Sequence, residues 1–65
     1  MPHEEMLREY TRCWKNMLSA SAERRMAELE AQAAKEGLRF QITNEAQWMM
    51  PHYLGDPHFE LAQLN

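Results

Sequence analysis

Three side chains able to bind a metal ion lie close together near the C-terminal end of the sequence. His52, Asp56 and His58 fall within seven residues of one another. Two imidazoles and a carboxylate suit a divalent transition metal. Their spacing is not the i, i+4 pattern by which a helix presents paired histidines to zinc, and in a loop rich in proline and glycine such residues also serve as turn or cap residues. We therefore expect no cofactor, and these three residues remain a weak metal-binding alternative.

The single cysteine, Cys13, is the next residue with distinctive chemistry. A catalytic thiol needs a general base within hydrogen-bond reach and a third group that orients the base. Cys13 instead adjoins Trp14 in an apolar stripe, where cysteine behaves as a small hydrophobic residue. The only glycines, Gly37 and Gly55, lie too far apart to form a phosphate loop. We therefore expect no enzymatic activity and no small-molecule substrate.

Basic residues at helical spacing form the third group with possible chemistry. Arg8, Arg12 and Lys15 share one helical face, and together with Arg24 they could contact the phosphates of a nucleic acid. However, the chain has 7 basic and 10 acidic residues, with a net charge of −3, and the two signs are interspersed. Nonspecific binding of nucleic acid requires a concentrated basic surface. A dimeric nucleic-acid-associated regulator, or an antitoxin-like protein, is therefore an alternative function, and nucleic acid is not the expected partner.

The strongest candidate for a binding site is a cluster of large apolar side chains on either side of Pro51. Its members are Trp48, Met49, Met50, Tyr53 and Leu54. Trp and Tyr are enriched among the residues that dominate binding energy, and Met adapts its shape to a partner. A short helix cannot turn all five inward, so we expect part of this cluster to bind another protein. The competing interpretation is that the cluster folds back onto Trp14 and packs in the protein's own core.

The elements that position these residues begin with a long helical region. The 34 residues from His3 to Glu36 contain neither glycine nor proline, and Gly37 follows them as a helix terminator. Two apolar stripes, one around Tyr10 and one around Leu29, are out of phase by roughly 130° at 100° per residue. The chain therefore either turns at residues 19–21 to form a helical hairpin or continues as one long helix, straight or bent. We favour one long helix, because residues 19–21 contain no strong helix breaker.

A strand is predicted over residues 38–43, where apolar and polar residues alternate. Leu38, Phe40 and Ile42 occupy one face of this strand. A single strand cannot satisfy its own backbone hydrogen bonds, so it must pair with the tail, with a second copy of the chain or with the sheet edge of a partner. We include these three residues among the candidate partner-binding residues.

The last third of the sequence predicts a short helix followed by a tail. Asn44 is a suitable cap, with glutamine three residues later, for a helix that runs through Trp48 to about Met50. Asp56 and Pro57 resemble a cap and a first helical position, which favours a short helix or an ordered tail over residues 57–64. A second strand that pairs with residues 38–43 is the alternative there.

These elements predict a mainly α fold in a single small domain, residues 1–65. The helical region spans 3–36, the strand 38–43, and the short helix and tail 44–65; an α+β fold with a two-stranded or intermolecular sheet is the alternative. A chain of 65 residues buries only roughly 60% of its unfolded surface, and one cysteine forms no internal disulfide. We therefore expect a homodimer, or a subunit that docks onto a larger protein.

The function expected from the sequence is that of a small protein–protein interaction module. It would act as an inhibitor, adaptor or accessory subunit by docking the cluster around Pro51 onto a partner. No apolar stretch approaches the roughly 20 residues that cross a bilayer, so we expect no membrane partner. The unpaired cysteine and the absence of an export-signal pattern indicate the reducing cytoplasm.

Overall fold

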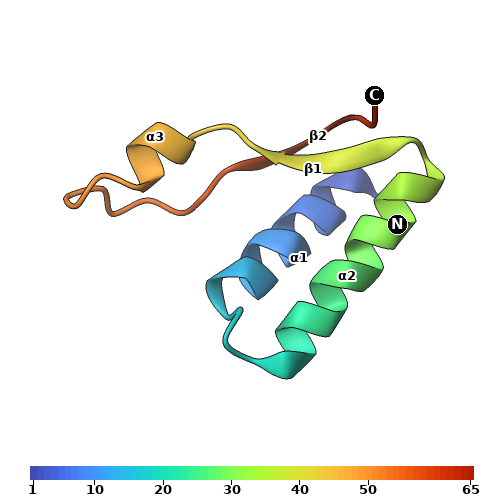
Figure 1. The fold of residues 1–65 in the computed structure, drawn as a ribbon, viewed down its shortest axis with the longest axis horizontal. Helices are drawn as coiled ribbons and strands as arrows, with labels where there is room; N and C mark the ends of the chain where they lie inside the picture. Colours follow the sequence, from blue (N-terminus) through green and yellow to red (C-terminus); the bar gives the residue numbers. More distant parts are fainter.

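The chain folds as two helices packed on one face of a two-stranded antiparallel sheet (Figure 1). The computed structural model describes residues 1–65. Its elements are α1 (His3–Lys15), α2 (Ala20–Lys35), β1 (Leu38–Ile42), α3 (Glu45–Trp48) and β2 (Phe59–Gln63). Helices account for 51% of the chain, and with the sheet this composition is compatible with the α+β class, the alternative considered from the sequence. None of the helices has the length and apolar character that crossing a membrane requires.

The predicted helical region is broken at residues 16–19, so the expectation of one long helix is wrong. At the end of α1 the backbone N–H of Asn16 donates to the carbonyl of Cys13, and its side-chain amide donates to the carbonyl of Arg12 at 3.0 Å. Ser19 then adopts an extended backbone before α2 begins. The turn has a physical reason: it allows the two out-of-phase apolar stripes to face the same core.

The core is small and centres on Tyr10. Its buried members are Met6, Tyr10, Leu29, Ala33 and Phe59. The ring of Tyr10 stacks on Phe40 with centroids 3.9 Å apart and meets the ring of Phe59 edge-on at 4.9 Å. Burial, together with the hydrogen bond that its hydroxyl donates to Glu30, raises the pKa of Tyr10. One side chain therefore connects α1 to α2 and to both strands.

The predicted strand is confirmed as β1, and it pairs with the tail of the same chain. The register places Phe40 opposite Leu61 and Ile42 opposite Phe59. The preferred helix over residues 57–64 is therefore wrong, because that segment contains β2. Antiparallel pairing satisfies backbone groups of β1 that a helical tail would leave unpaired, and this requirement outweighs the local cap signal at Asp56.

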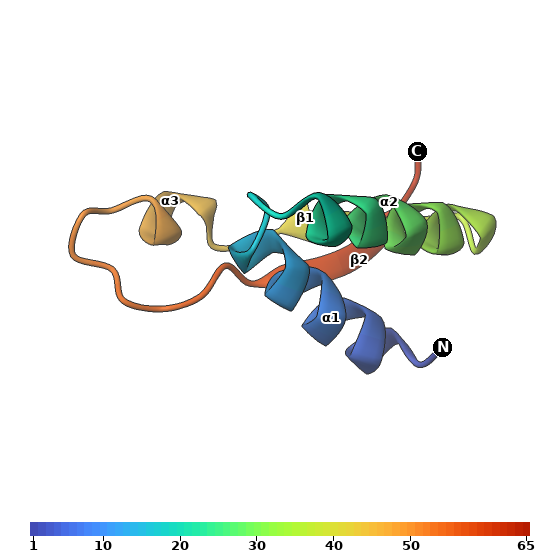
Figure 2. The same cartoon turned by 90° about the horizontal axis from the view of Figure 1, so that it is seen from below.

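Residues 44–58, here called the arm, connect the two strands and project beyond the helix pair (Figures 1 and 2). The predicted short helix is confirmed as α3 at the start of the arm. The radius of gyration is 12.1 Å, against about 10.7 Å expected for a compact chain of this length. The accessible surface is 4896 Å², against about 4,300 Å² expected from the mass. The arm therefore leaves the protein more exposed than a closed domain of its size.

A charged contact on the surface also joins the two long helices. The guanidinium of Arg25 donates from Nε and from a terminal nitrogen to the two carboxylate oxygens of Glu9, at 2.6 and 3.1 Å. It also donates to Glu28 at 3.0 Å. The hydrogen bond from Arg25 lowers the pKa of Glu9. This bidentate contact fixes how α1 and α2 lie against each other.

Truncation of the core should unfold much of the population. Leu29 is fully buried, so we expect Leu29→Ala to lower the free energy of unfolding by about 2–5 kcal/mol. The matched control is Leu18→Ala, since Leu18 is fully exposed, and it should change stability by less than about 0.5 kcal/mol. Urea denaturation followed by circular dichroism measures both. Equal effects of the two substitutions would contradict the described core.

Stability should fall in acid because of the Glu9–Arg25 contact. The pKa of Glu9 is lowered from 4.5 in the folded chain, so the unfolded chain takes up the proton first. The contribution of the contact is therefore present above pH 4.5 and is lost as the pH falls through the lower, folded pKa. Urea denaturation at a series of pH values should show this loss, and Glu9→Gln should make it shallower. An unchanged pH dependence in Glu9→Gln would show that the contact contributes nothing.

Candidate functional site

Large apolar side chains are exposed in the arm and in the turn between α1 and α2. Leu54 is 98% exposed, and Met49 and Met50 are 67% and 60% exposed; all three belong to the arm. Leu18, at 104%, and Met17 lie in the turn between α1 and α2. The arm reaches one extremity of the long axis, whereas the turn lies at the end of the helix pair away from the sheet, so the two are separate (Figure 1). We call Met49, Met50 and Leu54, which all belong to the arm, the apolar end.

Two contacts hold the arm against the last turns of α1. The ring of Trp48 meets the ring of Trp14 edge-on, with centroids 4.6 Å apart. The ammonium nitrogen of Lys15 lies 3.0 Å from a carboxylate oxygen of Asp56. An edge-to-face aromatic pair is worth about 0.5–1.5 kcal/mol beyond the surface that it buries. The arm is therefore attached to the helix pair at both of its sides.

Asn44 closes the base of the arm, which differs from its predicted role. Its side chain makes no capping hydrogen bond to α3. Instead, Nδ2 donates to the carbonyl of Asp56 at 3.0 Å and to the hydroxyl oxygen of Tyr53 at 3.2 Å, and Oδ1 accepts the backbone N–H of His58 at 2.8 Å. Asn44 is the N-cap residue of α3, as predicted, but its side chain does not make the capping hydrogen bond, because groups returning along the arm take up its hydrogen-bonding capacity.

The structure divides the predicted partner-binding residues into three groups. Trp48 is half-buried against Trp14, as the competing interpretation supposed. Met49, Met50 and Leu54 are exposed, and Tyr53 is partly exposed with its hydroxyl bound to Asn44. The third group is on β1, where Leu38, Phe40 and Ile42 are half-buried and pack against the core. The side chains of β1 are thus part of the fold, and among the predicted partner-binding residues only those of the arm are exposed to solvent.

The weak metal-binding candidates are not brought together. Asp56 pairs with Lys15, and the Nε2 atom of His58 lies 3.6 Å from a carboxylate oxygen of Glu60. His52 lies in the exposed part of the arm. No group of three or more His, Cys, Asp or Glu side chains in the structure could hold a metal ion. The geometry gives the metal-binding hypothesis no support.

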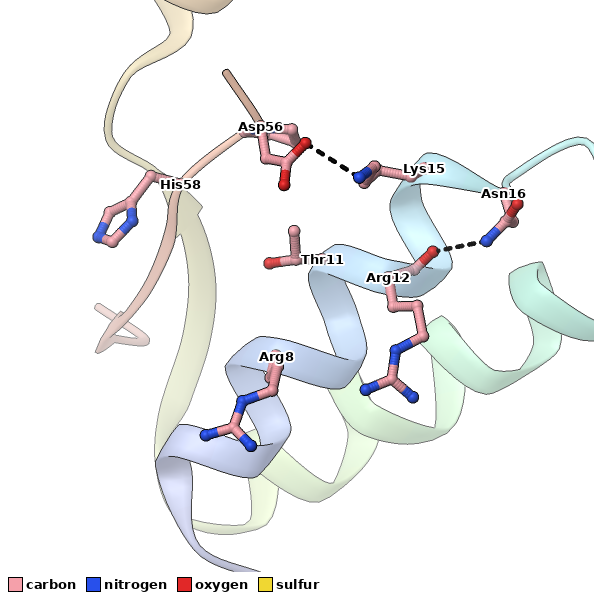
Figure 3. Close-up of a pocket in the computed structure, with 8 residues that line it drawn as sticks. Arg8, Thr11, Arg12, Lys15, Asn16, Asp56 and His58 are labelled. Carbon is pink, nitrogen blue, oxygen red and sulfur yellow. Dashed lines mark hydrogen bonds and ion pairs between the residues drawn. The ribbon is translucent and has the colours of Figure 1, made fainter. Parts of the chain in front are cut away.

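The basic residues of α1 form one wall of a groove (Figure 3). Arg8, Arg12 and Lys15 face the segment from Asp56 to His58 across a volume of about 520 Å³. Arg24 lies elsewhere, exposed on α2. The helical spacing predicted that the first three share a face. It did not predict the opposite wall, which comes from the far end of the sequence and is placed there by the pairing of β2 with β1.

Comparisons with protein-family models, with curated proteins and with solved structures find no significant match to this chain. The apolar end and the groove on α1 are the two candidate sites of this chain.

Removal of the Asn44 side chain should loosen the arm while the helix pair stays folded. Asn44→Ala deletes three hydrogen bonds, each typically worth about 1 kcal/mol or less at an exposed site. We expect faster amide hydrogen exchange across residues 45–57 and unchanged exchange in α2. Gln47→Ala is the matched control, because Gln47 is exposed in the same arm. If exchange in the arm is equally slow in both variants, Asn44 does not close it.

Proposed function

We propose that this protein is a small protein–protein interaction module that docks its apolar end onto a partner protein. It would act as an inhibitor, adaptor or accessory subunit, by covering a surface of the partner or by bridging two proteins. The observation that carries the proposal is the exposure of Met49, Met50 and Leu54 on an arm that is itself held in place. A disordered loop would expose the same residues without a fixed shape.

The energetics favour a surface that becomes covered. Burial of one Leu or Met side chain contributes about 1.5–3 kcal/mol, and Leu54 is almost completely uncovered. The contacts at Trp48 and Asn44 already restrict the arm. Docking would therefore lose less conformational freedom than the ordering of a flexible loop, and more of the burial energy would remain as affinity.

The sheet offers a second, weaker contribution to docking. β1 has one hydrogen-bonded neighbour, β2, so its other edge is not paired within the sheet. Its apolar side chains are committed to the core, so any strand addition there would act through the backbone. A second copy of this chain, which would make a homodimer, could use either surface.

Substitution of the arm should abolish docking while the fold is retained. We expect the triple variant Met49→Ser, Met50→Ser, Leu54→Ser to bind its partner at least about tenfold more weakly, since a loss of about 1.4 kcal/mol already gives that factor. The control is Leu64→Ser, which also alters an exposed leucine but lies beyond β2 near the C-terminus. Circular dichroism should show the same helix content in all variants.

The partner needed for this binding measurement can be identified with a photo-crosslinking residue placed at position 54. We expect irradiation in the host cell to give an adduct of defined mass from position 54 and none from position 64, and to give no adduct when Met49 and Met50 are replaced by serine. A dimeric mass would identify a second copy as the partner. Identical adducts from both positions would contradict docking through the apolar end. Docking would also be contradicted if position 54 gave no adduct and sedimentation showed a monomer at every protein concentration.

A further inference from the structure

The groove on α1 differs in chemistry from the apolar end. It lies between α1 and the segment that leads into β2, and apart from Pro57 its lining side chains are polar or charged (Figure 3). Arg8, Arg12 and Lys15 supply one wall, and Asp56 and His58 the other. An occupant of this volume of about 520 Å³ must therefore be polar, unlike the occupant expected at the apolar end.

Two carboxylates around the groove already have cationic partners. Asp56 is paired with Lys15 at 3.0 Å, and Glu9 is paired with Arg25 at 2.6 Å. Glu60 lies 3.6 Å from a ring nitrogen of His58. Glu5 lies beside the two arginines and forms no ion pair. Asp56 and Glu9 are thus neutralised mainly by Lys15 and Arg25.

Arg8 and Arg12 are the cations left without a partner. Neither forms an ion pair with a carboxylate of the chain. Both side chains extend from α1 in the same direction, away from the Lys15–Asp56 pair (Figure 3). They are four residues apart, which separates their positions by about 6 Å along the axis. Two arginines on one helix face can both donate hydrogen bonds to a single anion.

We propose that Arg8 and Arg12, at the open side of this groove, bind a phosphate monoester. The planar fork of a guanidinium matches the geometry of phosphate oxygens, and two such groups can neutralise a dianion. Lys15 adds charge from the same wall, since its ammonium retains two N–H donors after one contacts Asp56. The site is independent of the apolar end, because it uses neither its residues nor its chemistry.

A compact anion fits this surface better than a long polyanion. Glu4 and Glu60 line the neighbouring groove along α1, next to Arg8. A nucleic acid that followed the helix would pass these carboxylates, and the whole chain carries a net charge of −3. Repulsion from both sources disfavours an extended chain of phosphates, whereas one phosphate contacts only the cationic part.

The test is a titration of the full-length protein with inorganic phosphate and with O-phosphoserine, followed by NMR of the arginine Nε–H and backbone amide signals. We expect saturable shifts at Arg8 and Arg12. Arg8→Gln and Arg12→Gln should each weaken binding at least about tenfold, as expected for loss of a charged hydrogen bond. Arg24→Gln makes the same change of net charge at an exposed site on α2 and should leave the affinity unchanged.

Four results would overturn the proposal. The first two are chemical shifts that never saturate and an unchanged phosphate affinity in Arg8→Gln. The third is a loss of affinity in Arg24→Gln as large as that in Arg8→Gln or Arg12→Gln. The fourth is tighter binding of a short DNA duplex or of anionic lipid vesicles than of phosphoserine. The last would assign the same arginines to a nucleic acid or to a lipid surface. The substituted side chains lie on the helix surface, and an unchanged amide spectrum outside the groove would confirm that each variant is folded.

Discussion

The antiparallel pairing of β1 with β2 is the constraint on which the rest of this structure depends. It requires the chain to leave the sheet after Ile42 and return to it at Phe59, directly opposite. The intervening residues must therefore form a closed arm. The same pairing brings Asp56 within 3.0 Å of Lys15, which completes the groove on α1. Both candidate surfaces thus follow from one set of backbone hydrogen bonds, supported by the stacking of Tyr10 on the inner face of the sheet.

Local patterns predicted the elements whose signals are local, and failed where distant residues compete. The alternation of apolar and polar residues around Phe40 predicted the strand that is now β1. Gly37, predicted to end the helical region, has a positive φ of 74°. The break after α1 was only the less favoured alternative from the sequence, because Asn16 and Ser19 are compatible with a helix interior as well as with its ends. The turn between α1 and α2 is favourable because it lets both apolar stripes pack into one core. Likewise, the cap signal at Asp56 is genuine, but the unpaired backbone of β1 outweighs it.

The candidate sites were predictable in composition and not in arrangement. The cluster around Pro51 was visible in the sequence, since a short helix cannot bury so many large side chains. Which of them stay exposed depends on Trp14, which covers Trp48 and leaves Met49 and Met50 in solvent. The groove shows the same limit: helical spacing aligned its three basic residues, whereas its other wall is some forty residues further along the chain. Tertiary contacts decide such arrangements, and periodicity carries no information about them.

The central claim is that a second molecule covers the apolar end, and methionine methyl NMR tests it most directly. The methyl groups of Met49 and Met50 report on the arm, whereas Met1, also partly exposed, reports on the N-terminus. With ¹³C-methyl methionine in the protein, we predict that host-cell extract, or a higher protein concentration, shifts and broadens the Met49 and Met50 signals and leaves Met1 sharp. Signals of Met49 and Met50 that stay as sharp as that of Met1 under both conditions would contradict the claim.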